Sequence, residues 1–120
     1  MIYKFTIPGR LPSMNEIVSA SKSHYMQYAT MKKDNTNLVS MIAKSSVKRQ
    51  LDKIDIEINW ICKNRRMDKD NIIAGTKFIL DGLVNAGIIK NDGWSEIGDI
   101  NHKFDVDKKD PRIEVKLKEI

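Results

Sequence analysis

Apolar and polar residues alternate in three segments of the chain, and each alternation predicts a β-strand with one buried face. The segments are residues 2–7 (IYKFTI), 54–62 (IDIEINWIC) and 112–118 (RIEVKLK). A further β-like segment follows Trp94 and extends to about residue 106, and the sequence DKKDP after it predicts a turn. The pattern therefore predicts four strands, the last two of which follow each other directly.

Two further segments have the periodicity of helices. In residues 31–51 the apolar positions follow a loose helical stripe, whereas in residues 70–86 they occupy one broad face at about 100° per residue. The predicted core positions of the second helix are Ile72, Ile73, Thr76, Ile79, Leu80, Leu83 and Val84. Its polar face carries Asp70, Ala74, Lys77, Asp81 and Asn85. Asp68 or Asp70 is placed to cap its start, and Gly87 is placed to end it.

The segments between these elements are predicted to be loops. Residues 13–30 are polar and show no clear period, so we expect a long loop, which in a small domain is often functional. Residues 63–69 form a charged loop. The resulting order of elements predicts the α/β (α+β) class: a mixed β-sheet with two main helices packed on it. The length fits one domain over residues 1–120.

The composition narrows the classes of partner. The net charge of +5 favours an acidic partner, and Lys63, Arg65, Arg66 and Lys69 crowd beside a group of aspartates. Cations that border carboxylates suit a phosphate substrate held against a metal. The single cysteine, Cys62, excludes an internal disulfide and a cysteine-based zinc site. No apolar run approaches the length of a membrane span, so we expect no membrane partner and a cytoplasmic location.

Three aspartates are the candidate metal ligands. Asp68 and Asp70 alternate around Lys69, so both carboxylates can point the same way in an extended loop. Asp92 lies just past the far end of the following helix, and a strand or turn can bring it back. Hard oxygen ligands suit Mg²⁺, with Mn²⁺ as a substitute, and such a metal can polarise a phosphodiester and activate water.

These aspartates also have a simpler interpretation. Aspartates at the start of a helix commonly cap it, and Asn91-Asp92-Gly93 is an ordinary turn sequence. Spacing alone therefore leaves the metal site as one hypothesis beside a purely structural one.

The run DKDNIIAGTKFILDGLVNAGIIKNDGW resembles the central segment of RusA-family Holliday junction resolvases. That segment has an aspartate pair followed by asparagine, a helix with a lysine and an ILDGL-like stretch, and then an AG turn and a D/N-D pair. The opening IPGRLPSMN is also similar to the start of that family, including its S-x-N element, which ends at Asn15. The resemblance covers nearly the whole chain. It implies a RusA-like fold and a homodimer with magnesium-dependent sites, encoded by a bacterium or a phage.

By position, the resemblance matches Asp68, Asp70 and Asp92 to the metal-binding aspartates and Lys77 to the helix lysine. Two further positions, Asp81 and Asn91, match an acid in the helix and an additional aspartate that is neutral here. Asp70 and Lys77 are separated by three residues more than in the type member, and Met67 stands where that type has arginine. The candidate DNA contacts are the clustered cations Lys63, Arg65, Arg66 and Lys69, together with Asn15 of the S-x-N element.

Three functions follow as hypotheses. The first is a magnesium-dependent endonuclease that resolves four-way (Holliday) junctions in recombination and repair, with Asp68, Asp70, Asp92 and Lys77 as its catalytic residues. Because a junction has near two-fold symmetry, a dimer with one site per subunit fits it. The second is a non-catalytic protein that binds branched DNA, and the third is a structural protein whose aspartates only cap a helix. The helix over residues 31–51 and the first strand are both possible dimer surfaces.

Histidines and tryptophans receive simpler interpretations. His24 and His102 are expected to be surface or hydrogen-bonded residues rather than catalytic ones. Trp60 is expected in the core. Trp94, beside the candidate site, is expected in the core or at an interface, with stacking on an unpaired base as the alternative.

Overall fold

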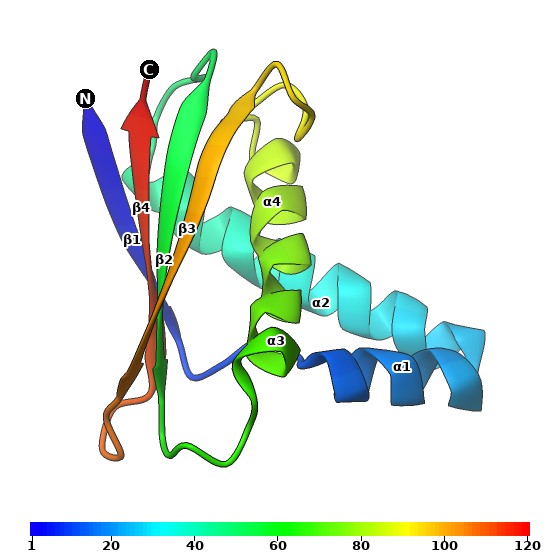
Figure 1. Ribbon diagram of the computed structural model, residues 1–120. Coiled ribbons are helices and arrows are strands. Elements are labelled where there is room, and N and C mark those ends of the chain that lie inside the picture. The colour runs from blue at the N-terminus through cyan, green and yellow to red at the C-terminus, as the bar shows by residue number, and fades with distance from the viewer.

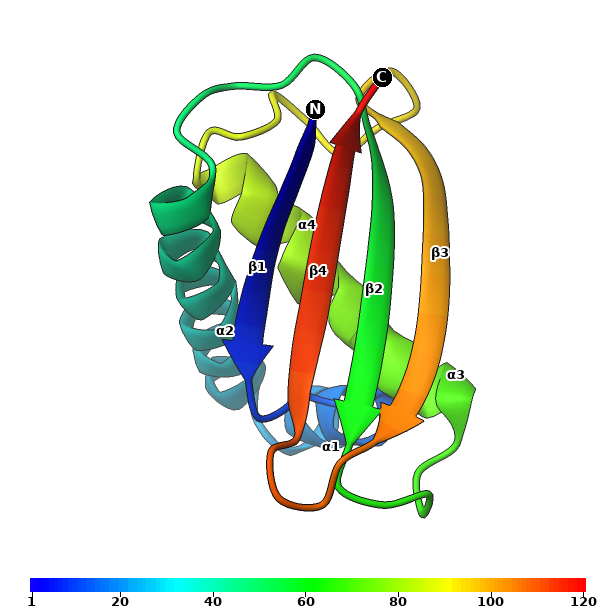
Figure 2. The same cartoon turned by 90° about the vertical axis from the view of Figure 1, so that its left-hand side faces the viewer.

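A computed structural model describes all of residues 1–120 and contains a four-stranded mixed sheet with helices on one face (Figures 1 and 2). The strands are β1 (Ile2–Pro8), β2 (Ile54–Cys62), β3 (Ile97–Val106) and β4 (Arg112–Glu119). Their order is β1-β4-β2-β3. The strand β4 is antiparallel to both of its neighbours, and β2 and β3 are parallel. The expected mixed sheet of the α+β class is confirmed.

Alternation in the sequence decides which face of the sheet is buried. In β2, the side chains of Ile54, Ile56, Ile58 and Trp60 are buried beneath the helices, whereas the residues between them lie on the other face. The open face turned to the viewer in Figure 2 carries charges that pair across strands. Glu57 lies 3.3 Å from the Nζ of Lys103 and 3.2 Å from the Nζ of Lys116. One face is therefore the core, and the other is a polar surface.

The expected loop over residues 13–30 is wrong, because this segment forms α1 (Met14–Ser23) and the start of α2 (Tyr25–Ser46). Ser13 and Glu16 form a capping box that starts α1. His24 then caps α2 through its Nδ1, which accepts a hydrogen bond from the backbone N–H of Met26. The helix predicted over residues 31–51 therefore begins earlier and ends earlier than expected. Figure 1 shows α1 and part of α2 extending away from the sheet.

The second predicted helix is close to the observed one but is divided in two. It consists of α3 (Lys69–Ile72), a 3-10 turn η1 (Ile73–Gly75) and α4 (Thr76–Asn85). Gly87, with φ of 75°, ends α4, since its N–H bonds to Val84 and that of Ile88 bonds to Leu83.

The buried face of α4 is rotated from the predicted one. The residues of α4 that are fully buried are Phe78, Ile79, Gly82 and Leu83. Gly82 allows this rotation, because a Cβ there would lie 2.5 Å from a methyl group of Val39 on α2. Thr76, Leu80 and Val84, which were predicted in the core, are only half-buried. None of the helices is long and apolar enough to cross a membrane.

Candidate functional site

Asp68 and Asp70 lie in an open groove of about 680 Å³ at the end of the sheet. The groove lies between the segment that follows β2 and the last residues of β3, and Arg65 and Lys69 also line it. Both aspartates are exposed, and neither makes a side-chain hydrogen bond or an ion pair in the chain. The structure thus brings together two free carboxylates and two cations.

The backbone around Asp68 leaves its carboxylate free. Asp68 is extended, with φ of −68° and ψ of 151°, and stands at the N-cap position of α3. Its carbonyl oxygen accepts hydrogen bonds from Asn71 and Ile72, each at 3.1 Å. Its side chain makes no capping hydrogen bond, so the expected capping role is wrong for the carboxylate of Asp68. The carboxylate is therefore available to a ligand.

The cations on this segment are also unpaired. Lys63, Arg65 and Arg66 are exposed and make no ion pair within the chain. The Nζ of Lys69 lies 5.1 Å from the centre of the Phe104 ring, which is a cation–π contact. Because these side chains neither neutralise the aspartates nor pair elsewhere, an anion can approach both groups at once.

Asn15 is brought to the same end of the molecule although it is distant in sequence. Its backbone N–H donates to the Oδ1 of Asn71 at 2.9 Å. The start of α1 is therefore attached to α3, directly beside Asp70. This hydrogen bond joins the S-x-N element to the aspartate pair.

Lys77 pairs with an acid of its own helix. Its Nζ lies 3.2 Å from the Oδ1 of Asp81, one turn further along α4. The Oδ2 of Asp81 is buried and has no hydrogen-bond partner. Since the helix already begins at Lys69, the additional residues between Asp70 and Lys77 lie inside it and form η1. Lys77 is thus about two turns from Asp70, on the outer side of the helix.

Asp92 and Asn91 do not join the aspartate pair within one chain. They lie in the segment between α4 and β3, at the opposite end of α4 from α3 (Figure 1). That segment contacts the start of β2, where Ile54 N–H donates to the carbonyl of Glu96 at 2.9 Å, whereas Asp68 follows the end of β2. The strand between them spans roughly 30 Å at about 3.3 Å per residue. No group of three carboxylate, histidine or cysteine side chains is close enough to hold a metal ion.

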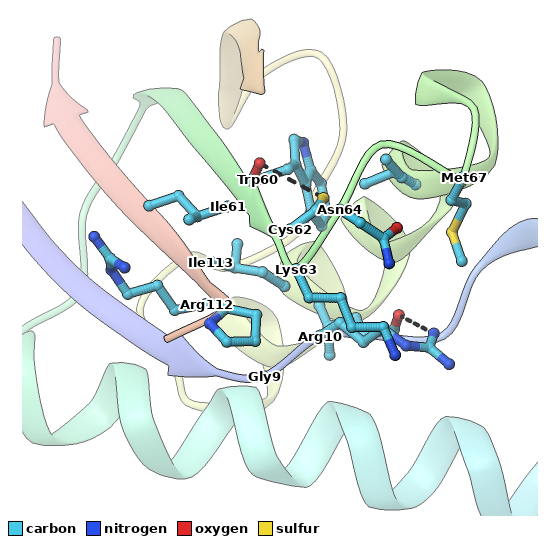
Figure 3. Close-up of a pocket in the computed structure, with 13 residues that line it drawn as sticks. Gly9, Arg10, Trp60, Ile61, Cys62, Lys63, Asn64, Met67, Arg112 and Ile113 are labelled. Atoms are coloured by element: carbon cyan, nitrogen blue, oxygen red, sulfur yellow. Dashed lines mark hydrogen bonds between the residues drawn. The ribbon is translucent and has the colours of Figure 1, made fainter. Parts of the chain in front are cut away.

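A second cavity, of about 280 Å³, lies next to the groove and is largely apolar (Figure 3). It shares Cys62, Asn64, Met67 and Ile72 with the groove. Its other lining residues are Gly9, Arg10, Leu11, Trp60, Ile61, Lys63, Pro111, Arg112 and Ile113. Gly75 adjoins it at close range, because a Cβ there would lie 3.0 Å from Leu11 and 3.1 Å from Trp60.

Sequence reasoning did not identify Arg10, which lines this cavity. Arg10 binds both carboxylate oxygens of Glu16, with its Nη2 2.8 Å from Oε2. The hydrogen bonds from Arg10 are the main reason that the pKa of Glu16 falls to about 2. Arg10 and Glu16 are six residues apart, and this spacing predicts no contact if residues 13–30 form a loop. The pair forms because Glu16 lies in the first turn of α1, which the sequence analysis did not predict.

The tryptophans and histidines occupy different environments. Trp60 is buried, as expected, and its Nε1 donates to the Nδ1 of His102 at 2.9 Å. Both histidines are therefore hydrogen-bonded, as expected. Burial lowers the pKa of His102. Trp94 does not lie in the core, since its side chain is 97% exposed.

Neither a scan against models of protein families nor a search of curated proteins finds a match to this chain. The resemblance to RusA-family resolvases therefore rests on the motif residues alone.

Proposed function

We propose that this chain is a magnesium-dependent DNA endonuclease that acts as a homodimer and resolves four-way junctions. The observation that carries the proposal is the groove in which Asp68 and Asp70 stand free beside unpaired cations. These opposite charges do not pair with each other within the chain. A bound cation together with a phosphate would satisfy both groups.

The donor set fits magnesium. Mg²⁺ takes one or two carboxylates and completes its coordination with water and phosphate oxygens. Asp68 and Asp70 would hold it, and the metal would supply a Lewis acid for the scissile phosphate and an activated water. Mn²⁺ would occupy the same ligands.

The basic side chains of the protein would bind and orient the DNA. Arg65, Arg66 and Lys63 are exposed on the same segment as the aspartates and would bind phosphates of the DNA. Lys69 lines the groove and contacts the ring of Phe104. Lys77 would serve as a point charge for a more distant phosphate of the same strand. Phosphate contacts of this kind position the substrate without reading its sequence.

The apolar cavity beside the groove would account for a preference for branched DNA. At about 280 Å³ it is close to the lower limit of ligand pockets, about 300 Å³. Its lining by Leu11, Met67 and Ile72, with the Asn64 amide, suits a planar base that has left its stack. Bases at a branch point unstack at less cost than bases in a continuous duplex. We therefore assign this cavity to a base next to the cut phosphate.

A second candidate, a non-catalytic protein that binds branched DNA, is favoured by one observation. One chain contributes only two of the three expected carboxylates to the groove, and Asn91 replaces a further acid. The basic surface alone suffices for such binding.

One assay separates these functions. The full chain is incubated with a labelled four-way junction and, separately, with a linear duplex of the same arms, in Mg²⁺ or in EDTA. We expect cleavage of the junction only with Mg²⁺ and retained junction binding in EDTA. Binding without cleavage in both Mg²⁺ and Mn²⁺ would establish the second candidate. Absence of both activities would refute both.

A further inference from the structure

Trp60 connects His102 to the apolar cavity. Trp60 lines the cavity (Figure 3), and its Nε1 donates a hydrogen bond to the Nδ1 of His102 at 2.9 Å. The two ring planes differ by only 22°, and their centroids are 6.0 Å apart. Because a hydrogen bond constrains both distance and direction, His102 determines how the indole of Trp60 is oriented.

Close packing fixes the rest of this indole. A Cβ at Gly75 would lie 3.1 Å from the Cζ3 of Trp60 and 3.0 Å from the Cβ of Leu11, so both side chains contact the same backbone position. Leu11 also lines the cavity. Trp60 is only 2% exposed, so a rotation of its indole displaces the groups around it. A change in the orientation of the indole therefore changes the lining of the cavity.

His102 and Phe104 follow each other on one face of β3 and support different parts of the site. In the register with β2, His102 lies beside Ile58 and Phe104 beside Trp60, on the face that the helices cover. Phe104 lines the groove and contacts Lys69, whereas His102 bonds to Trp60. The same strand thus lies behind both the groove and the cavity.

The hydrogen bond from Trp60 requires a neutral imidazole. An imidazole nitrogen accepts a hydrogen bond only when it carries no proton, so the neutral ring of His102 carries its proton on Nε2. In the imidazolium form both nitrogens are donors, and two N–H groups would face each other at this contact. Protonation of His102 therefore removes the bond and leaves a buried indole N–H without its acceptor.

The groups around His102 leave burial in control of its protonation. Burial lowers the pKa of His102, and no charged side chain adds to this shift. The adjacent Lys103 lies on the open face, where it pairs with Glu57. On α4, Lys77 and Asp81 pair with each other. The remaining neighbours are the apolar or aromatic residues Ile58, Trp60, Ile100 and Phe104 of the sheet and, beyond Phe104, the groove residues Asp68, Lys69 and Asp70.

We propose that His102 is a positioning residue that holds the indole of Trp60 and thereby makes the preference for branched DNA depend on pH. While the imidazole is neutral, the cavity keeps the lining that suits a planar base. Once the imidazole is protonated, nothing fixes the indole, and Trp60 and Leu11 no longer keep that shape. Acidification should then weaken the discrimination between junction and duplex. The step from Trp60 to a base rests on the proposed function, whereas the step from His102 to Trp60 does not.

The fluorescence of Trp60 tests the first step without any DNA. The chain has two tryptophans, so Trp94→Phe leaves Trp60 as the only one. We expect the emission of this variant to change as the pH falls from about 8 to about 5. The midpoint should lie below 6.5, the ordinary pKa of histidine. The far-ultraviolet circular dichroism should stay constant over the same range, since the fold is retained.

Three variants in the Trp94→Phe background assign this transition. His102→Asn keeps an acceptor oxygen near the position of Nδ1 but cannot be protonated, so its emission should stay constant. His102→Leu removes the acceptor and should show the low-pH emission throughout. His24→Asn replaces the other histidine with a good capping residue for α2, and the transition should remain. A transition that persists in His102→Asn, or that is absent from the folded Trp94→Phe protein, would overturn the positioning role.

Junction binding in EDTA tests the second step. For the wild-type chain, we expect the ratio of the affinities for a four-way junction and a linear duplex to fall several-fold through the same pH range. His102→Asn should keep a constant ratio. A wild-type ratio that does not change, or one that changes equally in His102→Asn, would overturn the pH dependence. If the wild-type chain binds no junction at any pH, the proposed function fails, and the fluorescence still decides whether His102 positions Trp60.

Discussion

The open face of the sheet and the groove at its end are both rich in charge, yet their charges are arranged differently. On the open face, hydrogen bonds from Lys116 and Lys103 lower the pKa of Glu57. In the turn before β4, hydrogen bonding to Glu114 and Asp107 raises the pKa of Arg112. In the groove, Asp68 and Asp70 have no such partners. Glu57 and Arg112 are thus held by partners within the chain, whereas Asp68 and Asp70 remain available to a ligand.

The largest expected contrast is between one free and one paired carboxylate. Asp70→Asn should lower the rate of junction cleavage by at least about 100-fold, because losing a metal ligand costs no less than losing its supporting partners. Glu57→Gln should leave the rate unchanged. Single-turnover rates over a range of Mg²⁺ concentrations measure both. If Asp70→Asn binds the junction normally in EDTA and still cuts at the wild-type rate, Asp70 is not a metal ligand.

Lys77 belongs to both classes of charge, since it pairs with Asp81 and is proposed to act on DNA. We expect Lys77→Ala to lower cleavage by about tenfold or more, the scale of one charge-assisted hydrogen bond. Removing the i,i+4 pair should lower the free energy of unfolding by only about 0.2–0.5 kcal/mol. Asp68 and Asp70 should still bind Mn²⁺ in calorimetry. Cleavage at a near-wild-type rate would show that Lys77 only forms a surface ion pair with Asp81 and does not act on DNA.

The unpaired cations of the groove should control affinity. Arg65→Ala combined with Arg66→Ala should weaken junction binding by roughly tenfold, because two cations that bind phosphates are removed. The slope of log affinity against log salt should fall by about 0.9 for each phosphate that is no longer neutralised. Lys116→Ala, which removes a paired cation, is the matched control. Fluorescence anisotropy in EDTA measures both, and equal effects of the two changes would contradict the comparison.

The cavity beside the groove should affect the selectivity for branched DNA rather than the overall affinity for DNA. Met67→Trp fills part of the cavity, so we expect the preference for the junction over the linear duplex to fall several-fold. Affinity for the linear duplex should stay the same. Met41→Trp, at an exposed position of α2, is the control. An unchanged preference in a folded Met67→Trp protein would separate the cavity from branch recognition.

The smallest expected effect concerns Glu16, which pairs with Arg10 of the cavity lining. Arg10 holds the pKa of Glu16 at about 2, below its ordinary value of 4.5. Because the folded state favours the ionised form, this pair contributes stability above pH 4.5 that is lost as the pH falls toward 2. Glu16→Gln should therefore reduce that part of the acid dependence in urea unfolding. An identical pH dependence in both proteins would show that the pair contributes nothing measurable.

The parts of the fold that were predicted correctly are those with a local signal. The alternation in residues 54–62 identifies β2 within its observed bounds, because one buried face imposes it. α1 has no such signal, since Ala20 is its only buried residue, although the spacing of Ser13 and Glu16 marks its start. The rotated face of α4 depends on Gly82 meeting α2, which no local pattern contains.

The candidate site likewise combines residues that are close in sequence with residues that only the fold brings together. Asp68 and Asp70 are separated by one residue, so their proximity was predictable from the chain alone. The hydrogen bond between Asn15 and Asn71 joins two segments that are distant in sequence, and no pattern in the chain predicts that they meet. The position of Asp92 depends on the direction of α4, which the sequence pattern leaves open.

The helical rod from α3 through α4 has the properties of a molecular ruler. The distance between its two ends is set by the number of residues in the helix and not by which side chains they carry. One inserted residue would lengthen it by about 1.5 Å and turn everything beyond the insertion by about 100°. Most exposed positions along it can therefore vary freely. A single insertion or deletion would instead change both the distance and the angle between Asp70 and Asp92. Homologous chains that keep the same number of residues between Asp70 and Asp92 would preserve the spacing of the two halves, whatever side chains lie between them.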